Sequence, residues 1–482
     1  MSYPEDWAAS TVGGLADVVR GVTFKKADAS RESVPNGIGV LRAGNILAEG
    51  RLDFGDLVFV PSSSVKEQQL IRRDDIVLAM SSGSISVVGK TAPVESPPPF
   101  RVAFGAFCGL VRPRDASRAP WLRWFFQTQE YRRTVSALAK GVNINNLKPR
   151  DLEALEIGVP PLDQQRRIVE KIEALTAKSR RAKEALDAIP PLLERFRQSV
   201  LAAAFRGDLT RDWREQHPDV EPADQLLARI RKERRRRWEE AELEKMRAKG
   251  KAPKDDRWKA KYKEPEPVDT EGLPELPRGW CWASLEGLTD PARVIRYGIL
   301  KPGPETAGGV RYVKVKHLRG DRIVSATELP RTTQAISDQF AGAVLGHGDL
   351  LLSIRGTFGR VALVEAEHAG ANITQDSARV APMPGVNRDY LAACLRAPQV
   401  QGYFASIAKG VAVRGINIRD VRPTAIPLPS GAEQIALADT TSKFLGTAEH
   451  FDAAVSAGRA RIPEAEASIL AIAFRGRLVQ PE

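Results

Sequence analysis

The two halves of this chain repeat one another at a fixed distance, and this repeat dictates the architecture. The motif Ala-Lys-Gly-Val at residues 139–142 returns at 408–411, and Ala-Phe-Arg-Gly at 204–207 returns at 473–476. The stretch between the two motifs therefore has the same length in both copies. Loops tolerate insertions, whereas a helix paired with another element cannot change length without losing its register. The repeat predicts two copies of a unit in which a globular domain is followed by a long helix.

The stretch between the two motifs shows the apolar spacing of a long helix that packs along a partner. In the first copy the spacing runs from Ile168 to Val200, and in the second it runs more loosely from Leu437 to Ile472. Prolines stand inside both stretches, at 190, 191 and 463. Because proline lacks the amide donor and clashes with the preceding turn, we expect each helical arm to consist of two segments in line.

Upstream of each predicted helix, short apolar runs rich in Val, Ile, Gly and Pro indicate a mostly β domain with a small helix near residues 121–138 and 390–407. The expected fold class is α+β, with two mostly β domains separated by long antiparallel helices in a pseudo-two-fold arrangement. The expected boundaries are 1–159 for the first domain, 160–210 for the first long helix, 211–275 for a basic linker, 276–428 for the second domain and 429–482 for the second long helix.

The charge of the chain favours a polyanionic partner. Lysine and arginine number 72 against 60 acidic residues, which gives a net charge of +12, and such an excess attracts phosphate backbones. The excess is concentrated in residues 229–263, where 16 basic residues face 7 acidic ones. This linker is either a basic arm on DNA or a solvated, partly helical tether. Of the two interpretations we favour the tether.

The sequence contains no recognisable catalytic or metal-binding constellation. The three cysteines lack a C-x-x-C spacing, and none of the five histidines has ligand spacing. Residues 96–100 come close to a methyltransferase motif, but the residue before the final Pro-Pro is itself a proline and no Gly-rich cofactor loop follows a strand. There is also no signal peptide or run of about 18 apolar residues. We therefore expect a non-enzymatic, cytoplasmic protein that binds no cofactor or metal and does not contact a membrane.

Taken together, the repeated motifs resemble the specificity subunits of type I restriction-modification systems over nearly the whole chain. Pro-x-x-Trp opens each domain, at 4–7 and 277–280, Lys-Gly-Val precedes each long helix, and Ala-Phe-Arg-Gly closes it. The segment 157–168 also has a counterpart at 426–435. The second copy departs from the pattern, because Ser-Gly-Ala-Glu at 430–433 replaces Pro-Leu-Asp-Gln. This departure raises the question whether both helices grip a partner equally well.

The resemblance implies a DNA-recognition subunit in host defence. Each of two target-recognition domains would read one half of a split, asymmetric sequence in double-stranded DNA, with the long helices acting as a ruler between them. It further implies two modification subunits that bind S-adenosylmethionine and methylate adenine, and restriction subunits that use ATP and Mg. Catalysis and cofactors would belong to those partners, and none to this chain.

Base reading requires side chains that reach the edges of the grooves, such as arginine or lysine to guanine and asparagine to adenine. Such side chains could equally be ordinary surface groups or phosphate contacts, and His317 could be a satisfied histidine at a sheet edge. The candidate DNA-binding residues are Lys25, Lys26, Arg42, Asn45, Ser82, Ser84 and Lys90 in the first domain, and Arg296, Tyr297, Lys314, Lys316, His317, Arg355, Thr357 and Arg360 in the second.

Apolar residues left over after the helices pair would suit a helix of a modification subunit. Phe205 and Phe474 could instead pack only against their own domains. The candidate partner-binding residues are Ile168, Ile172, Leu192, Phe196, Leu201, Phe205, Phe444, Ile469 and Phe474.

Two other functions are compatible with the residues. One is a coiled-coil assembly scaffold without a DNA role, which salt-dependent binding to duplex DNA would contradict. The other is a fused DNA methyltransferase with degenerate motifs, which methyl transfer by the isolated chain would establish.

Overall fold

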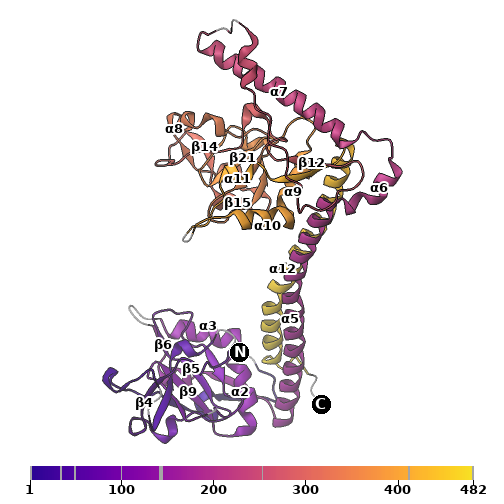
Figure 1. Ribbon diagram of the computed structural model, residues 1–482. Helices are drawn as coiled ribbons and strands as arrows, with labels where there is room; N and C mark the ends of the chain where they lie inside the picture. Colours follow the sequence, from indigo (N-terminus) through magenta and orange to yellow (C-terminus); the bar gives the residue numbers. More distant parts are fainter. Residues whose placement is uncertain are drawn as a thin grey trace. The chain divides into compact units, whose positions relative to one another are not determined.

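The computed structural model describes residues 3–32, 35–47, 50–98, 100–140, 145–251, 253, 255–410 and 413–479. The chain divides into two compact units, one of Met1–Ala188 with Val455–Glu482 and one of Ile189–Ala454. Each unit contains one β-rich domain and a part of two long helices, α5 (Leu162–Arg206) and α12 (Gly431–Ala473), as Figure 1 shows.

The first domain contains three main sets of paired strands. A four-stranded antiparallel sheet has the order β2 (Ala16–Arg20), β9 (Cys108–Pro113), β5 (Ile76–Ala79) and β7 (Thr91–Pro93). A three-stranded sheet has the order β4 (Val58–Pro61), β3 (Gly37–Leu41) and β8 (Val102–Phe104), in which β3 and β8 are parallel. Finally, β1 (Ala8–Thr11) pairs with β11 (Glu156–Val159), with Ala8 opposite Val159.

The second domain repeats these three sets of paired strands in the same order. Its four-stranded sheet has the order β13 (Arg296–Tyr297), β21 (Ser377–Val380), β18 (Leu350–Ser353) and β19 (Val361–Leu363). Its three-stranded sheet has the order β17 (Arg331–Thr332), β14 (Val310–Val313) and β20 (Asn372–Ile373), and β14 and β20 are parallel. The pair β12 (Cys281–Ser284) and β22 (Ala425–Leu428) corresponds to β1 and β11. The predicted α+β fold is thus confirmed.

Each domain has two short helices where the sequence suggested one. These are α2 (Ala119–Phe125) and α3 (Gln129–Leu138) in the first domain, and α9 (Arg388–Arg396) and α10 (Pro398–Ile407) in the second.

The central strand of each domain is apolar on both faces because each face covers a different core. Successive side chains of a strand point to opposite sides. In β5, Ile76 and Leu78 belong to the core that contains the helices, whereas Val77 belongs to the core beneath the three-stranded sheet. In β18, Leu350 and Leu351 divide in the same way. This explains why both strands occur in the sequence as continuous apolar runs.

Each long helix ends in the core of the domain that belongs to the other copy. Phe205, at the end of α5, is buried in the core of the second domain, with its ring centroid 5.9 Å from that of Trp282. Phe474, just after α12, is buried in the first domain and stacks on Trp121 at 4.2 Å. The expectation that these residues pack on their own domains or on a partner is therefore wrong.

The glycine two residues after each phenylalanine allows each long helix to end against the domain of the other copy. Gly207 has φ +77°, and a Cβ there would lie 2.9 Å from Pro277 and Trp280. Gly476 has φ +69°, and its Cβ would lie 2.3 Å from Pro4. Only glycine adopts this backbone at such close approach without strain. The Ala-Phe-Arg-Gly motif of each copy consequently packs on the Pro-x-x-Trp motif of the other.

The two long helices pair antiparallel within each unit. In the first unit the guanidinium of Arg459 lies 2.5 Å from the carboxylate of Asp187. In the second unit the rings of Phe196 and Phe444 are 6.2 Å apart, and Arg197 lies 3.5 Å from Asp452. In the same unit Phe205, near the end of α5, shares a core with Leu437, near the start of α12, so residue numbers rise along one helix as they fall along the other.

The prolines do not divide the helices, contrary to our expectation. α5 continues through Pro190 and Pro191, and α12 continues through Pro463. A proline inside a helix costs about 3 kcal/mol. Contacts with the other helix on both sides of Pro190 and Pro191, at Asp187 and at Arg197, offset this cost.

The linker is more ordered than a solvated tether. It contains α6 (Arg211–Gln216), α7 (Ala223–Ala248) and a 3-10 helix, η7 (Asp256–Lys261). Leu226, Leu227 and Ile230 of α7 are buried in the core of the second domain. The tether interpretation is therefore wrong for the first half of α7, because its apolar stripe completes that core.

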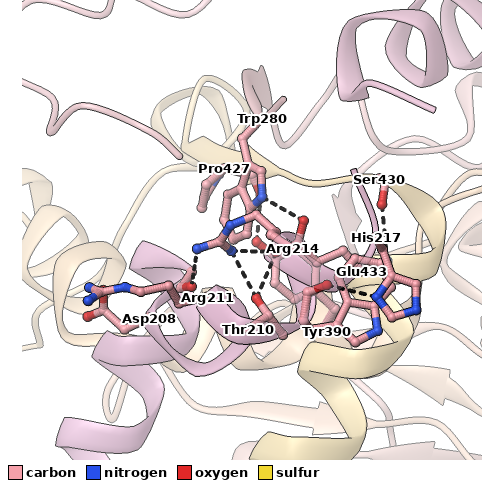
Figure 2. Close-up of polar contacts among 12 residues, drawn as sticks. Asp208, Thr210, Arg211, Arg214, His217, Trp280, Tyr390, Pro427, Ser430 and Glu433 are labelled. Carbon is pink, nitrogen blue, oxygen red and sulfur yellow. Dashed lines mark hydrogen bonds and ion pairs between the residues drawn. The ribbon is translucent and has the colours of Figure 1, made fainter. Parts of the chain in front are cut away.

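A buried polar cluster joins the linker to the start of α12 (Figure 2). Glu433 is 2% exposed and accepts hydrogen bonds from the indole of Trp280 at 2.9 Å, the hydroxyl of Thr210 at 2.7 Å and the guanidinium of Arg214 at 2.5 Å. In the first copy the equivalent residue is Gln164, which accepts from the indole of Trp7 at 3.0 Å. The second copy thus has the carboxylate of Glu433 where the first has the amide of Gln164, and the linker supplies Arg214 as the cation that pairs with this carboxylate.

Candidate nucleic-acid interface

The hairpin loop after the central strand of each domain is the centre of the candidate site. In the first domain this loop joins β5 to β7, and Arg132 of α3 donates to the carbonyls of Ser86 and Val88, both at 3.0 Å. In the second domain the loop joins β18 to β19, and Gln401 of α10 donates to the carbonyl of Gly359 at 2.9 Å. Arg132 and Gln401 occupy equivalent positions of the repeat. Each loop is therefore fixed by a helix of its own domain.

The loop that carries the Lys-Gly-Val motif lies beside the hairpin loop in both domains. In the first domain β10 (Asn145–Asn146) pairs with β6 (Ser81–Ser82), and the side chain of Asn145 donates to the carbonyl of Gly83 at 3.2 Å. In the second domain Arg355 pairs with Gly415, and the amide of Gly356 donates to the carbonyl of Arg414 at 3.0 Å. Residues 141–144 and 411–412 of the motif loops lie outside the described residues.

In the second domain these loops expose several cations on one surface. The side chains of Arg355, Thr357 and Arg360 are exposed, and Arg360 also donates to the carbonyl of Leu318 at 3.4 Å. Arg414 is exposed and lies over the ring of Phe358 at 5.7 Å. Arg355 donates to the amide oxygen of Gln375 at 3.4 Å. A 3.4 Å hydrogen bond at the surface is weak, so the guanidinium of Arg355 can exchange it for a ligand.

Tyr297 and Arg296 lie on an edge strand that adjoins this surface. Tyr297 is 47% exposed, and the backbone of Gln375 donates to Ile299 two residues further along. Lys316 is exposed, and Lys314 lies over the ring of Tyr312 at 5.3 Å.

The corresponding surface of the first domain is less cationic. Ser82 is half-buried and accepts from the amide of Ser84, whose own hydroxyl pairs with Ser86 at 2.8 Å. Lys90 is half-buried. Beside this loop, a depression of about 370 Å³ on α3 is lined by Arg132, Arg133, Ser136, Ala137 and Lys140.

Two of the candidate residues stabilise turns instead of facing solvent. Asn45 is 3% exposed, accepts from the amide of Arg42 and donates to the carbonyls of Asp53 and Asp56. His317 takes the same place in the second domain, where its Nδ1 accepts from the amide of Lys314 at 3.1 Å. Burial, with the charge of nearby Lys316, lowers the pKa of His317, so the ring is neutral at pH 7. The prediction that Asn45 and His317 contact DNA is therefore corrected, because both side chains stabilise turns within their own domains.

The remaining candidates of the first domain lie apart from the hairpin loop. Arg42 pairs with Asp56 at 2.6 Å, and Lys25 is exposed. Lys26 begins the 3-10 helix η1 (Lys26–Asp28), and its side chain lies outside the described part.

Several residues of this surface were not among those predicted from the sequence. These are Arg132, Lys140 and Asn145 in the first domain, and Gln401, Lys409 and Arg414 in the second. The repeat carried a usable signal, because Lys140 and Lys409 belong to the duplicated motif. Arg414 and Asn145 join the surface only through the pairing of the two loops.

Most of the predicted partner-binding residues are buried within the chain itself. Ile168 and Ile172 belong to the core of the first domain, and Leu201 belongs to the core of the second. Together with Phe205 and Phe474, these side chains are not available to a partner, because the ends of both helices complete the domain cores. Leu192, Phe196 and Phe444 are 52%, 41% and 41% exposed, and Ile469 is half-buried. Further exposed apolar side chains of α12 are Ile435, Phe451 and Ile472, at 54%, 55% and 44%. The helical spacing included Phe451 and Ile472 but not Ile435.

The cysteine thiols of the chain are poor nucleophiles. Burial raises the pKa of Cys108 and of Cys394 to about 12, and that of Cys281 to about 11. Among the described residues, no group of three or more His, Cys, Asp or Glu side chains could hold a metal ion. In that same part of the chain, no helix is long and apolar enough to cross a bilayer.

Comparison with known proteins shows what the chain is similar to. Residues 4–189 match the family model of the type I restriction modification DNA specificity domain. The chain is 43% identical over 215 residues to the EcoKI specificity subunit of Escherichia coli K12, and 44% identical over 214 residues to the StySPI specificity subunit of Salmonella potsdam. It is 24% identical over 480 residues, 99% of its length, to the EcoBI specificity subunit of Escherichia coli.

The chain is thus similar to the specificity subunits of type I restriction-modification systems, and residues 4–189 match their DNA specificity domain. The matches to the EcoKI and StySPI relatives each span about half of those proteins, 46% of their length, whereas the EcoBI match spans 87%. Solved structures show the same fold. A chain of a type I restriction-modification system, studied for complex assembly and conformational transition, matches with a TM-score of 0.65 at 17% identity over 99% of this chain and all of that one. The HsdS subunit from Thermoanaerobacter tengcongensis matches with a TM-score of 0.56 at 18% identity, over 99% of this chain and 98% of that one.

Proposed function

We propose that this chain is a specificity subunit that recognises a bipartite, asymmetric sequence in double-stranded DNA, with each domain reading one half. The observation that carries the proposal is the duplicated pair of loops, which joins equivalent strands in both domains but differs in length and in side chains. Arg355, Thr357 and Arg360 face solvent in one copy, where Ser82, Ser84 and Lys90 stand in the other. Different side chains at the same place read different bases, so the two half-sites would differ.

The proposal assigns catalysis to partner subunits. This chain would bind two modification subunits, which carry S-adenosylmethionine and methylate adenine, and would recruit restriction subunits that use ATP and Mg, all in the cytoplasm. The lengths of α5 and α12, 45 and 43 residues, would set the spacer between the half-sites.

Mapping methylated adenines in cells tests the recognition role. The chain is co-expressed with the neighbouring modification-subunit gene, and methylated sites are mapped across the host genome with and without it. We expect a split, asymmetric motif that vanishes when this chain is deleted. A stable complex that methylates no such motif would contradict the proposal.

Replacing one loop arginine should relax recognition at one half-site only. A bidentate contact from arginine to guanine discriminates against other bases by about 1–3 kcal/mol, so Arg355→Gln should weaken selection in the half-site of the second domain by about 5- to 150-fold. The other half of the motif should stay unchanged. Arg278→Gln, which removes an exposed arginine outside the loops, is the control. Equal effects of the two variants would exclude Arg355 from base reading.

The exposed rings on the paired helices should be required for binding the modification subunits. In this proposal Phe196 and Phe444, each 41% exposed and in contact with one another, form an apolar contact for a partner helix. We expect Phe196→Ser with Phe444→Ser to abolish co-purification of the modification subunit. Phe107→Ser, at a more exposed phenylalanine (65%) of the first domain, should leave it unchanged. Retention of the partner by the double variant would place its binding site elsewhere.

A further inference from the structure

The strongest concentration of charge on the molecule lies outside the recognition loops. It covers the outer part of α7 and the strap that follows it, residues 229–263, which we call the basic arm. This arm carries nine of the twelve net positive charges, so the rest of the chain is only weakly basic. The proposed reading of half-sites by the two domains makes no use of this segment.

The base of the arm is fixed to the second domain. Arg234 is 5% exposed and donates to the carbonyl of Thr289 at 3.1 Å and to the hydroxyl of Tyr262 at 3.2 Å. Arg237 pairs with Asp290 at 2.8 Å. Farther along, Trp238 stacks on Trp258 of the strap at 6.1 Å. The strap therefore runs back along α7 and packs against it, so the base of the arm is an ordered structure and not a flexible tether.

The cations at the base of the arm, residues 229–237, and those at its tip, residues 245–263, differ in residue type and in the number of ion pairs that they form. Residues 229–237 contain six arginines and one lysine, and several of them form ion pairs within the chain, such as Arg236 with Glu233 at 2.6 Å and Arg229 with Glu221 at 2.5 Å. Residues 245–263 contain seven lysines and two arginines against two acidic residues. Among the described residues of the tip, five exposed cations form no ion pair, namely Arg247, Lys249, Lys251, Lys261 and Lys263.

This pattern suits a phosphate backbone better than a protein or a membrane. Lysine is a flexible point charge that binds phosphate without fixed geometry, and like charges at this density repel one another unless an anion covers them. Protein interfaces depend on a desolvated apolar core, and membrane-surface helices depend on an apolar face. None of the strongly exposed large apolar side chains of the described residues lies on the arm.

Figure 1 shows α7 at one end of the second domain and α10 at the other. The recognition loop is at the α10 end, because Gln401 of α10 holds Gly359. We propose that the tip of the basic arm binds the backbone of duplex DNA without sequence preference, at a stretch outside the recognised sequence. This inference rests on the proposed function, because it assumes that the chain binds duplex DNA.

Salt-dependent binding of the full chain to duplex DNA tests the inference. Lys249→Gln with Lys251→Gln removes two unpaired cations of the tip. Arg229→Gln with Arg236→Gln removes the same charge from two paired cations at the base. Affinities are measured over a range of salt concentrations, with a duplex of the target alone and with the same target extended by flanking DNA.

On the extended duplex, we expect the tip variant to lower the slope of log affinity against log salt by about 1.8, because each phosphate that the chain no longer neutralises reduces the slope by about 0.9. The base variant should lower it by less than half as much. Extending the duplex should strengthen binding by the wild-type chain more than binding by the tip variant. The preference for target over non-target DNA should be the same in all three proteins.

Each other outcome overturns the inference. An unchanged slope in the tip variant, with normal binding by the wild type, would remove the arm from the DNA and leave the proposed function intact. Equal reductions in both variants would reveal only a general effect of charge. An unchanged slope with loss of the co-purified modification subunit would assign the arm to an acidic protein surface. If the wild type itself shows no salt-dependent binding, the proposed function fails as well. Thermal melts verify that the variants fold.

Discussion

Replacing Arg214 with alanine will lower the free energy of unfolding by about 3 kcal/mol, because it leaves the buried carboxylate of Glu433 without its cation. Glu433 is 2% exposed, and the side chain of Arg214 is only 19% exposed. The remaining donors to Glu433, the indole of Trp280 and the hydroxyl of Thr210, are neutral and cannot compensate a buried charge (Figure 2). Chemical denaturation followed by tryptophan fluorescence measures the change.

The internal repeat supplies the rescue for this variant. Gln164 holds the indole of Trp7 in the first copy as an uncharged amide. Glu433→Gln should therefore restore the Arg214→Ala variant to within about 1 kcal/mol of the wild type, because no buried charge is left to compensate. The matched control is Arg211→Ala, which lies in the same helix, is 69% exposed and pairs with Asp208 at 3.8 Å. It should cost less than about 0.5 kcal/mol.

Failure of the rescue would change the interpretation of this cluster. If Glu433→Gln leaves the Arg214→Ala variant equally unstable, the contribution of Arg214 comes from its packing over the ring of Trp280, at 5.6 Å, and not from its charge.

Replacing Phe474 with alanine will destabilise the first domain by about 3–5 kcal/mol, although that domain lies at the opposite end of the sequence. The ring is 5% exposed, stacks on Trp121 at 4.2 Å and lies 6.0 Å from Phe125. Its removal leaves a cavity in a core that cannot collapse around it. Hydrogen exchange should show reduced protection in β1 and β11, while β12 and β22 of the second domain keep theirs.

Phe451→Ala is the matched control for this prediction, because it removes the same side chain from α12 at a position that is 55% exposed. It should cost less than about 1 kcal/mol. Equal destabilisation by the two variants would show that the contribution of Phe474 lies in the helix pairing and not in the core of the first domain.

The duplicated architecture follows from the order of residues alone. The constant distance between the repeated motifs predicted helices of equal length. The short apolar runs upstream of each helix predicted a mostly β domain in each copy, and β5 and β18 are two of these runs. The candidates Ser82 and Arg355 closely follow these strands in the sequence, and the tertiary structure places both of them in the hairpin loops. Composition and charge patterning are local properties of the chain, so they can be interpreted without knowing what packs against what.

Which surfaces meet is a property of the folded chain, because it depends on contacts between residues that are distant in the sequence. A heptad-like spacing indicates that one face of a helix is covered, but not by what. We therefore predicted that Ile168, Leu201 and Phe474 would contact a partner, whereas they complete the domain cores. For the same reason the packing of α7 into the second domain was not predictable. Nor was the inward turn of Asn45, since only its three hydrogen bonds distinguish a residue of a turn from a DNA contact.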